Sequence, residues 1–78
     1  MLSEIRRRIE GKSISEREIQ VLRLISFELT TKEIAGELFI SPHTVISHRR
    51  NIMIKLDAKN SAGMIRKGFE AGLLSFSC

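Results

Sequence analysis

The sequence lacks the residues and runs on which several classes of protein depend. Its one cysteine, Cys78, is the last of 78 residues, which excludes an internal disulfide and a cysteine-based metal site. No apolar run approaches the length of a membrane span. Residues 1–13 have neither a long apolar region nor a small-residue cleavage site, so we expect no signal peptide. These absences favour a cytoplasmic protein without a membrane partner.

The arrangements of side chains that support catalysis are missing too. His43 and His48 are five residues apart, about 140° around a helix, so they do not converge on a metal ion. The chain has no glycine-rich loop of the kind that cradles phosphates. No specific Ser-His-Asp or Cys-His arrangement can be proposed. We therefore predict a protein that is not an enzyme and needs no cofactor or metal.

The chain does have charge, and it is unevenly distributed. Its net charge is +4, from 13 Lys and Arg against 9 Asp and Glu. Residues 14–40 carry three basic and five acidic side chains, whereas residues 41–78 carry six basic and two acidic ones. A basic half favours a polyanionic partner. On charge alone, an ordinary solvated surface is an equally good interpretation.

Length and composition indicate one small globular domain. Seventy-eight residues with 42% hydrophobic and 28% charged side chains fit a soluble domain rather than a disordered chain. We place the folded domain at residues 14–74 and a C-terminal tail at 75–78. Residues 1–13 are expected to be a tail or linker, although their apolar spacing also fits a short extra helix.

Four helix starts can be recognised. The stretches "SERE" at 15–18 and "TTKE" at 30–33 match capping boxes, in which a hydroxyl and a glutamate three residues later bond to each other's backbone N–H groups. "SPHT" offers Ser41 as N-cap and Pro42 at the first helical position. Asn60 is a fourth cap candidate. Strand signals are absent. We predict an all-α four-helix bundle, with helices over about 16–27, 31–39, 42–56 and 61–71.

The second and third predicted helices form a helix-turn-helix. Only "IS" or "FIS" joins them, and so short a connection forces a sharp turn. Helical spacing places Val45, Ile52 and Leu56 inward on the third helix. Glu18 falls on the apolar face of the first helix, where its capping role accounts for a carboxylate.

The outward face of the third helix is the candidate for contacts with bases. Arg50 could pair with guanine, Ser47 could bond to several bases, and Ile46 could lie against a thymine methyl. His43 is either base-facing or merely exposed. Arg50 as a plain surface cation and Ile46 as a protein contact are the alternatives. Phosphate contacts are expected near helix N-termini and flanks, from Thr31, Lys32, Thr44 and Lys55.

These stretches resemble the LuxR/FixJ-type helix-turn-helix domain of bacterial transcription regulators. The resemblance is carried by "SEREIQVLRLI", "TTKEIAGEL", "ISPHTVISHRRNIMIKL" and "GLL". It implies that the third helix enters the major groove of double-stranded DNA. It also implies a homodimer through the fourth helix, with RNA polymerase as a further candidate partner. The apolar positions of the fourth helix make Met64, Phe69 and Ala71 the candidate dimer contacts, and a wider core stripe is an equally good interpretation of them.

The sequence departs from the family pattern at several positions. Ile46 stands where Lys or Arg is usual, and Glu28 stands where glycine follows the first helix. If position 28 needs a positive φ, a non-glycine residue there costs about 1 kcal/mol. Gly63 and Gly68 lie inside the fourth helix, which is either loose or closely packed.

Two alternatives share these features. Sequence patterns similar to "SEREIQVL" and "EIAGEL" also occur in the promoter-recognising regions of σ factors. The stretch "NIMIKL" and the fourth helix argue against that assignment. A protein-interaction module that has lost DNA binding would use Ile46, Met53 and Ile54 as an apolar patch. In the leading interpretation the chain is a free-standing regulator or the output half of a longer protein.

Overall fold

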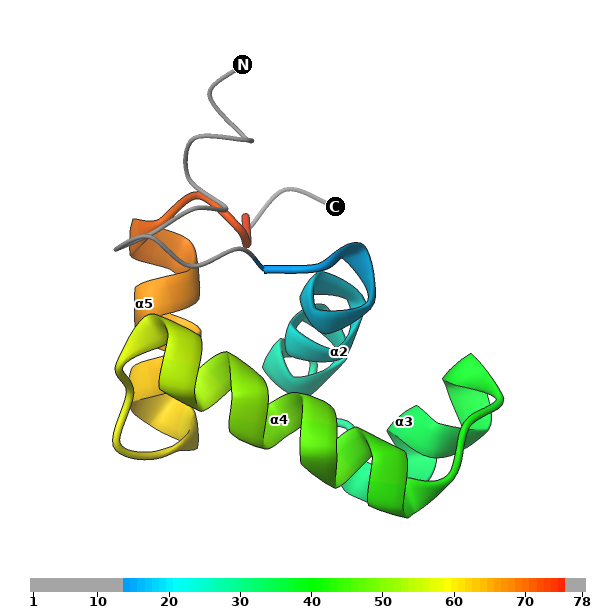
Figure 1. The fold of residues 1–78 in the computed structure, drawn as a ribbon. Helices are drawn as coiled ribbons and strands as arrows, with labels where there is room; N and C mark the ends of the chain where they lie inside the picture. The colour runs from blue at the N-terminus through cyan, green and yellow to red at the C-terminus, as the bar shows by residue number, and fades with distance from the viewer. Residues whose placement is uncertain (1–13, 76–78) are drawn as a thin grey trace.

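The computed structural model describes residues 14–75, and within that range it contains four helices and no strand. They are α2 (Glu16–Ser26), α3 (Thr31–Leu38), α4 (Pro42–Leu56) and α5 (Ser61–Glu70). Helix α4 packs against each of the other three, and Figure 1 shows α3 and α5 at its opposite ends. The predicted all-α, four-helix fold is confirmed. The short helix considered within residues 1–13 lies outside the described residues.

All four helices begin where the capping pattern predicts. The hydroxyls of Ser15 and Thr30 accept hydrogen bonds from backbone N–H groups three residues later, both at 3.1 Å, and both capping boxes are complete. Ser41 Oγ accepts a hydrogen bond from the Thr44 N–H at 3.1 Å, and Asn60 Oδ1 accepts one from the Gly63 N–H at 2.8 Å. These local bonds satisfy N–H groups that have no partner within the helix.

Three helices end one residue earlier than predicted. Phe27, Phe39 and Ala71 are C-caps rather than helical residues. Phe39 ends α3 because it adopts left-handed angles, φ 58° and ψ 42°. Gly72, at φ 78°, follows the cap of α5, and the next N–H returns to the Gly68 carbonyl at 2.8 Å, as in a Schellman motif.

The core joins residues from all four helices. Val45, Ile52 and Leu56 are buried on the inner side of α4, as predicted. Gly68 is buried as well, and a Cβ there would stand 2.9 Å from Leu74 Cδ1 and 3.0 Å from Leu22 Cδ2. Of the two alternatives for α5, close packing is therefore the correct one. The buried apolar set is Ile14, Val21, Leu22, Ile34, Ala35, Val45, Ile52, Leu56, Met64 and Leu74.

The turn after α2 keeps a left-handed residue although no glycine occupies it. Glu28 has φ 68°, so the conformation for which glycine is suited is retained with a bulkier side chain. Phe39 and Asp57 are the other non-glycine residues with positive φ among the described residues, at 58° and 55°. A left-handed conformation costs an L-residue about 1–2 kcal/mol. The packing of the helices thus holds three mildly strained turns.

Candidate nucleic-acid interface

A tight turn sets α4 across the end of α3. Phe39, Ile40 and Ser41 are the residues between the two helices. The Ile40 N–H donates to the Ala35 carbonyl at 3.1 Å, and Ile40 packs against the core. Ile34 and Val45, one from each helix, are both buried. This pair of helices has the helix-turn-helix arrangement that the short connection predicts.

The outer side of α4 presents the predicted base-contacting residues together. We call His43, Ile46, Ser47 and Arg50 the recognition face, and all four are exposed. Ile46 is 46% exposed, an unusual setting for a branched apolar side chain. Val45, beside it in the sequence, is buried because successive helical residues point about 100° apart. The helix therefore has one side in the core and one side open to a partner.

Arg49 and Arg50 differ in their surroundings. The sequence places Arg50, and not Arg49, on the outward face of the helix, but it gives no partner for Arg49. Arg50 is exposed, whereas Arg49 is partly buried. The Arg49 guanidinium donates a hydrogen bond to Ser61 Oγ at the start of α5, and its Nε is buried without a hydrogen-bond partner. Arg49 therefore connects α4 to α5. The difference follows from the 100° step between neighbouring helical residues. Because Ile52 points inward, that step places Arg49 nearer to the core side of α4 than Arg50.

Three of the four predicted phosphate contacts lie in the first turn of a helix. Thr31 and Lys32 occupy the first turn of α3, with Thr31 partly buried and Lys32 exposed. Thr44 lies in the first turn of α4, where its Oγ1 is 2.9 Å from Ser41 Oγ. Helix N-termini attract anions because unpaired N–H groups and the helix dipole point outward there. Their placement is suited to phosphate contact.

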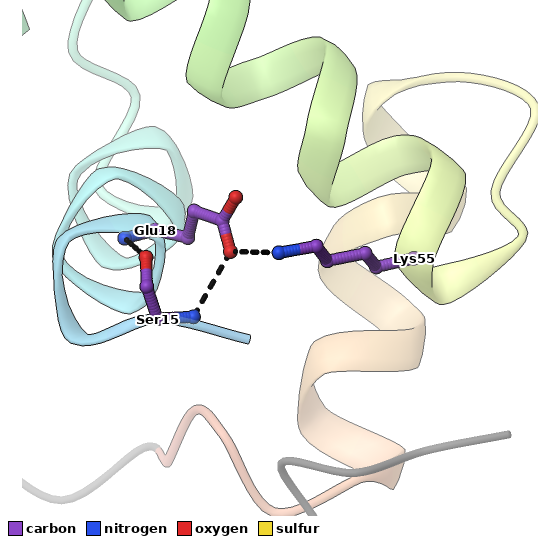
Figure 2. A network of polar contacts seen from close by, with 3 residues as sticks. All are labelled: Ser15, Glu18 and Lys55. Atoms are coloured by element: carbon purple, nitrogen blue, oxygen red, sulfur yellow. Dashed lines mark hydrogen bonds and ion pairs between the residues drawn. The ribbon is translucent and has the colours of Figure 1, made fainter. Parts of the chain in front are cut away.

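Lys55 has a partner within the protein. Its Nζ lies 2.8 Å from Glu18 Oε1, and the same oxygen accepts the Ser15 backbone N–H at 2.9 Å (Figure 2). Burial of Glu18 acts to raise its pKa, but hydrogen bonds from Lys55 and Ser15 and the charge of Lys55 together bring that pKa below its ordinary value. The carboxylate is thus held ionised between α2 and α4. The phosphate contact predicted for Lys55 stays a prediction.

A shallow groove runs along the outer side of α4. It has a volume of about 610 Å³ and is bordered by Ile46, Arg49, Arg50, Met53 and Ile54 from the helix and by Asp57 and Ala58 beyond it. Ile54 is 56% exposed. The apolar patch of the protein-interaction alternative therefore exists as a surface, and it overlaps the recognition face.

The candidate dimer contacts on α5 separate into two groups. Met64 is fully buried, at 0% exposure, so its side chain has no surface to offer a second subunit. Phe69 and Ala71 are partly exposed. Met64 is therefore a core residue, and Phe69 and Ala71 are the two that keep surface for a partner.

Within residues 14–75 no helix is long and apolar enough to cross a membrane.

Comparisons with known proteins identify the class of this domain. Residues 12–67 match the family model described as "Bacterial regulatory proteins, luxR family". Transcriptional regulatory protein FixJ of Rhizobium meliloti is 41% identical over 70 residues, which cover 90% of this chain and 33% of that protein. Oxygen regulatory protein NreC of Staphylococcus haemolyticus is 38% identical over 65 residues, covering 83% of this chain and 30% of that protein. The NreC protein of Staphylococcus aureus matches with the same identity and coverage.

The domain is thus a helix-turn-helix DNA-binding domain of a transcription regulator, not an enzyme. The chain belongs to the luxR family of bacterial regulatory proteins. This match also removes the σ-factor alternative. The chain spans about a third of the length of the curated relatives that it matches.

Proposed function

We propose that this domain binds double-stranded DNA sequence-specifically by inserting α4 into the major groove. The observation that carries the proposal is the division of α4 into two sides. Its inner side is fixed in the core by Val45, Ile52 and Leu56, while the recognition face is open to a partner. A rigid, well-anchored helix with an exposed polar and basic side is what major-groove recognition requires.

Each side chain of the recognition face is proposed to make a different contact with the bases. Arg50 donates to O6 and N7 of a guanine, the commonest specific contact in the major groove. Ser47 bonds to a neighbouring base edge. Ile46 contacts a thymine methyl, since it can offer no hydrogen bond. His43, in the first turn, is exposed at the end of α4 that enters deepest.

Phosphate contacts orient the domain on the duplex. Thr31 and Lys32 at the start of α3, and Thr44 at the start of α4, meet the DNA backbone. These contacts carry affinity without sequence information. Lys55 is expected among them from its sequence position, but its ammonium group is paired with Glu18.

The assembled regulator is proposed to be a homodimer. A second copy packs on the end of α5 through Phe69 and the C-cap residue Ala71, so that two α4 helices meet related half-sites. We propose residues 14–74 as the DNA-binding domain, with residues 1–13 as a tail, a linker or a short extra helix and residues 75–78 as a C-terminal tail. Coverage of about a third of each relative supports a role as the output part of a longer regulator. We propose that this regulator is cytoplasmic and contacts RNA polymerase.

The first test is selection from random duplex DNA followed by titration of the selected site at several salt concentrations. We expect a two-fold-related motif and an affinity that falls steeply with salt, because each phosphate contact releases counterions. Arg50→Ala should lose about 1–3 kcal/mol on the selected site and relax specificity at one base pair. Arg17→Ala, which removes an exposed arginine from α2, is the matched control.

The groove along α4 supports a second candidate, a protein-interaction surface. Its apolar residues, Ile46, Met53 and Ile54, would then contact a protein rather than a duplex. In that case no motif emerges from selection, and Arg50→Ala leaves DNA affinity no weaker than the Arg17→Ala control.

A further inference from the structure

We propose that Lys55, acting through Glu18, positions α4 for base recognition and does not contact the DNA backbone. This inference rests on the proposed DNA-binding function, and it gives Lys55 a different task from the phosphate contact that its place on α4 suggests. The residues that it acts on are those of the recognition face.

One carboxylate oxygen joins two helices that are distant in sequence. Glu18 Oε1 accepts a hydrogen bond from the Ser15 N–H, and this bond completes the cap of α2. The same oxygen accepts a hydrogen bond from Lys55 Nζ, in the last turn of α4. The two partners of the ion pair are 37 residues apart. Figure 2 shows the lysine side chain reaching across from α4 to the capped end of α2.

The environment of the pair favours a structural task. Glu18 is 4% exposed, and it is the one buried charged residue among the described residues. If Lys55 turned toward a phosphate, the Glu18 carboxylate would remain buried without its counter-ion, which is strongly unfavourable. The positive charge of Lys55 is also offset by Glu18, so it adds little to the attraction of a polyanion.

Directional contacts matter for α4 because its core contacts are not directional. Val45, Ile52 and Leu56 fix the inner side of α4 by burying apolar surface, and the Lys55–Glu18 ion pair adds a directional contact at its last turn. Ile46 and Lys55 are nine residues apart, about 13 Å along the helix axis. A tilt of about 5° about the Lys55 end therefore moves Ile46 by roughly 1 Å, more than the ~0.5 Å tolerance of a precise contact.

The test compares affinities of the domain for its selected duplex and for a random duplex across a salt series. Two variants remove one charge each with little change of shape, Glu18→Gln and Lys55→Met. We expect each to weaken binding to the selected site roughly tenfold, within the range for one bidentate base contact. Affinity for random DNA and the slope of affinity against salt should match those of the control variants.

The controls carry the same charge changes at exposed positions. Glu37→Gln on α3 matches Glu18→Gln, and Lys59→Met, beyond α4, matches Lys55→Met. The double variant Glu18→Gln/Lys55→Met should lose no more selected-site affinity than either single variant, because both break one interaction. Lys55→Arg, which keeps a cation for Glu18, should retain the preference for the selected site.

A phosphate contact by Lys55 predicts the opposite pattern and would overturn the proposal. Lys55→Met would then weaken selected and random DNA alike and reduce the salt slope by about 1 relative to its control. Glu18→Gln would free the ammonium group and strengthen both. Circular dichroism measures whether each variant keeps its helical content. If Lys55→Met loses helix, the Glu18→Gln variant tests the proposal by itself. Its amide oxygen can still accept the Ser15 N–H, so the cap of α2 is kept.

The two proposals fail in distinguishable ways. If the unmodified domain selects no motif, the proposed function fails. If it selects a motif and Glu18→Gln keeps the full preference for it, only the positioning role fails.

Discussion

At the scale of single residues, neighbouring side chains on α4 differ in what they do. Arg49 is bound to Ser61 and connects two helices, while Arg50 is exposed on the recognition face. Val45 is 1% exposed, and Ile46, the next residue, is 46% exposed. The chemistry of a residue type therefore does not assign its role in this helix. Its angular position does.

Ile46 is the residue whose substitution should change specificity most directly. Ile46→Lys replaces an exposed apolar side chain by a cation, so we expect a different base preference at one step of the selected motif. Because the site is on the surface, unfolding free energy should change by about 0.5 kcal/mol or less. The measurements are selection from random duplexes and thermal unfolding.

A control separates a new base contact from simple added charge. Ile54→Lys places the same cation on the same helix, at a position 56% exposed and two turns further along. It should raise affinity for all DNA without altering the base chosen beside Ile46. An unchanged motif for Ile46→Lys would mean that the recognition face is wrongly assigned.

At the scale of elements, each helix begins with a side-chain cap and ends close to a residue with positive φ. The starts depend on hydrogen bonds between residues three apart. The ends depend on Glu28, Phe39, Asp57 and Gly72, of which one is glycine. The starts are therefore predicted correctly, and three of the predicted ends are one residue too long.

Gly36 of α3 and Gly68 of α5 should respond oppositely to alanine. A Cβ at Gly68 would meet Leu74 at 2.9 Å and Leu22 at 3.0 Å, so Gly68→Ala overpacks the core and should destabilise the domain by about 1 kcal/mol or more. A Cβ at Gly36 would meet no such neighbour within 4 Å. Gly36→Ala should stabilise by about 0.5–1 kcal/mol through helix propensity.

Chemical denaturation of both variants measures the difference. Since the substitution is the same at both positions and both are helical, a stabilised Gly68→Ala would show that α5 is not closely packed on Leu22. In that case the loose alternative for this helix would be correct.

At the scale of the whole molecule, α4 is the element through which the others are held. It contacts α2, α3 and α5, and polar links run from Lys55 to Glu18 and from Arg49 to Ser61. The recognition face is thus carried by the best-connected helix of the domain. Such a support suits a surface that must keep its geometry on DNA.

Acid should weaken the whole domain through Glu18. Because the folded pKa of Glu18 lies below its ordinary value, the carboxylate contributes stability above the unfolded pKa, about 4.3. That contribution is lost as pH falls from there through the lower folded pKa. The difference in melting temperature between the unmodified domain and Glu18→Gln should therefore shrink on acidification below about pH 4.

The exposed residue Glu37 provides the reference for this measurement. Glu37→Gln should show no comparable change of its melting-temperature difference with pH. An acid dependence equal for the two variants would show that the Glu18–Lys55 pair contributes nothing specific to stability.

By itself, the sequence determined the helix starts, the all-α class and the division of α4 into an inner and an outer side. It could do so because caps join residues three apart and helical spacing repeats every 3.6 residues, so both are local. The family resemblance, confirmed by the match over residues 12–67, came from the same local motifs.

Only the tertiary structure decided the partner of Lys55, the partner of Arg49 and the full burial of Met64. Each depends on a contact between helices, such as the pair 37 residues apart that joins α4 to α2. Spacing along one helix shows which side a residue occupies, but not which atom of another helix it meets. That is settled by how the helices pack, and here packing placed Lys55 on Glu18.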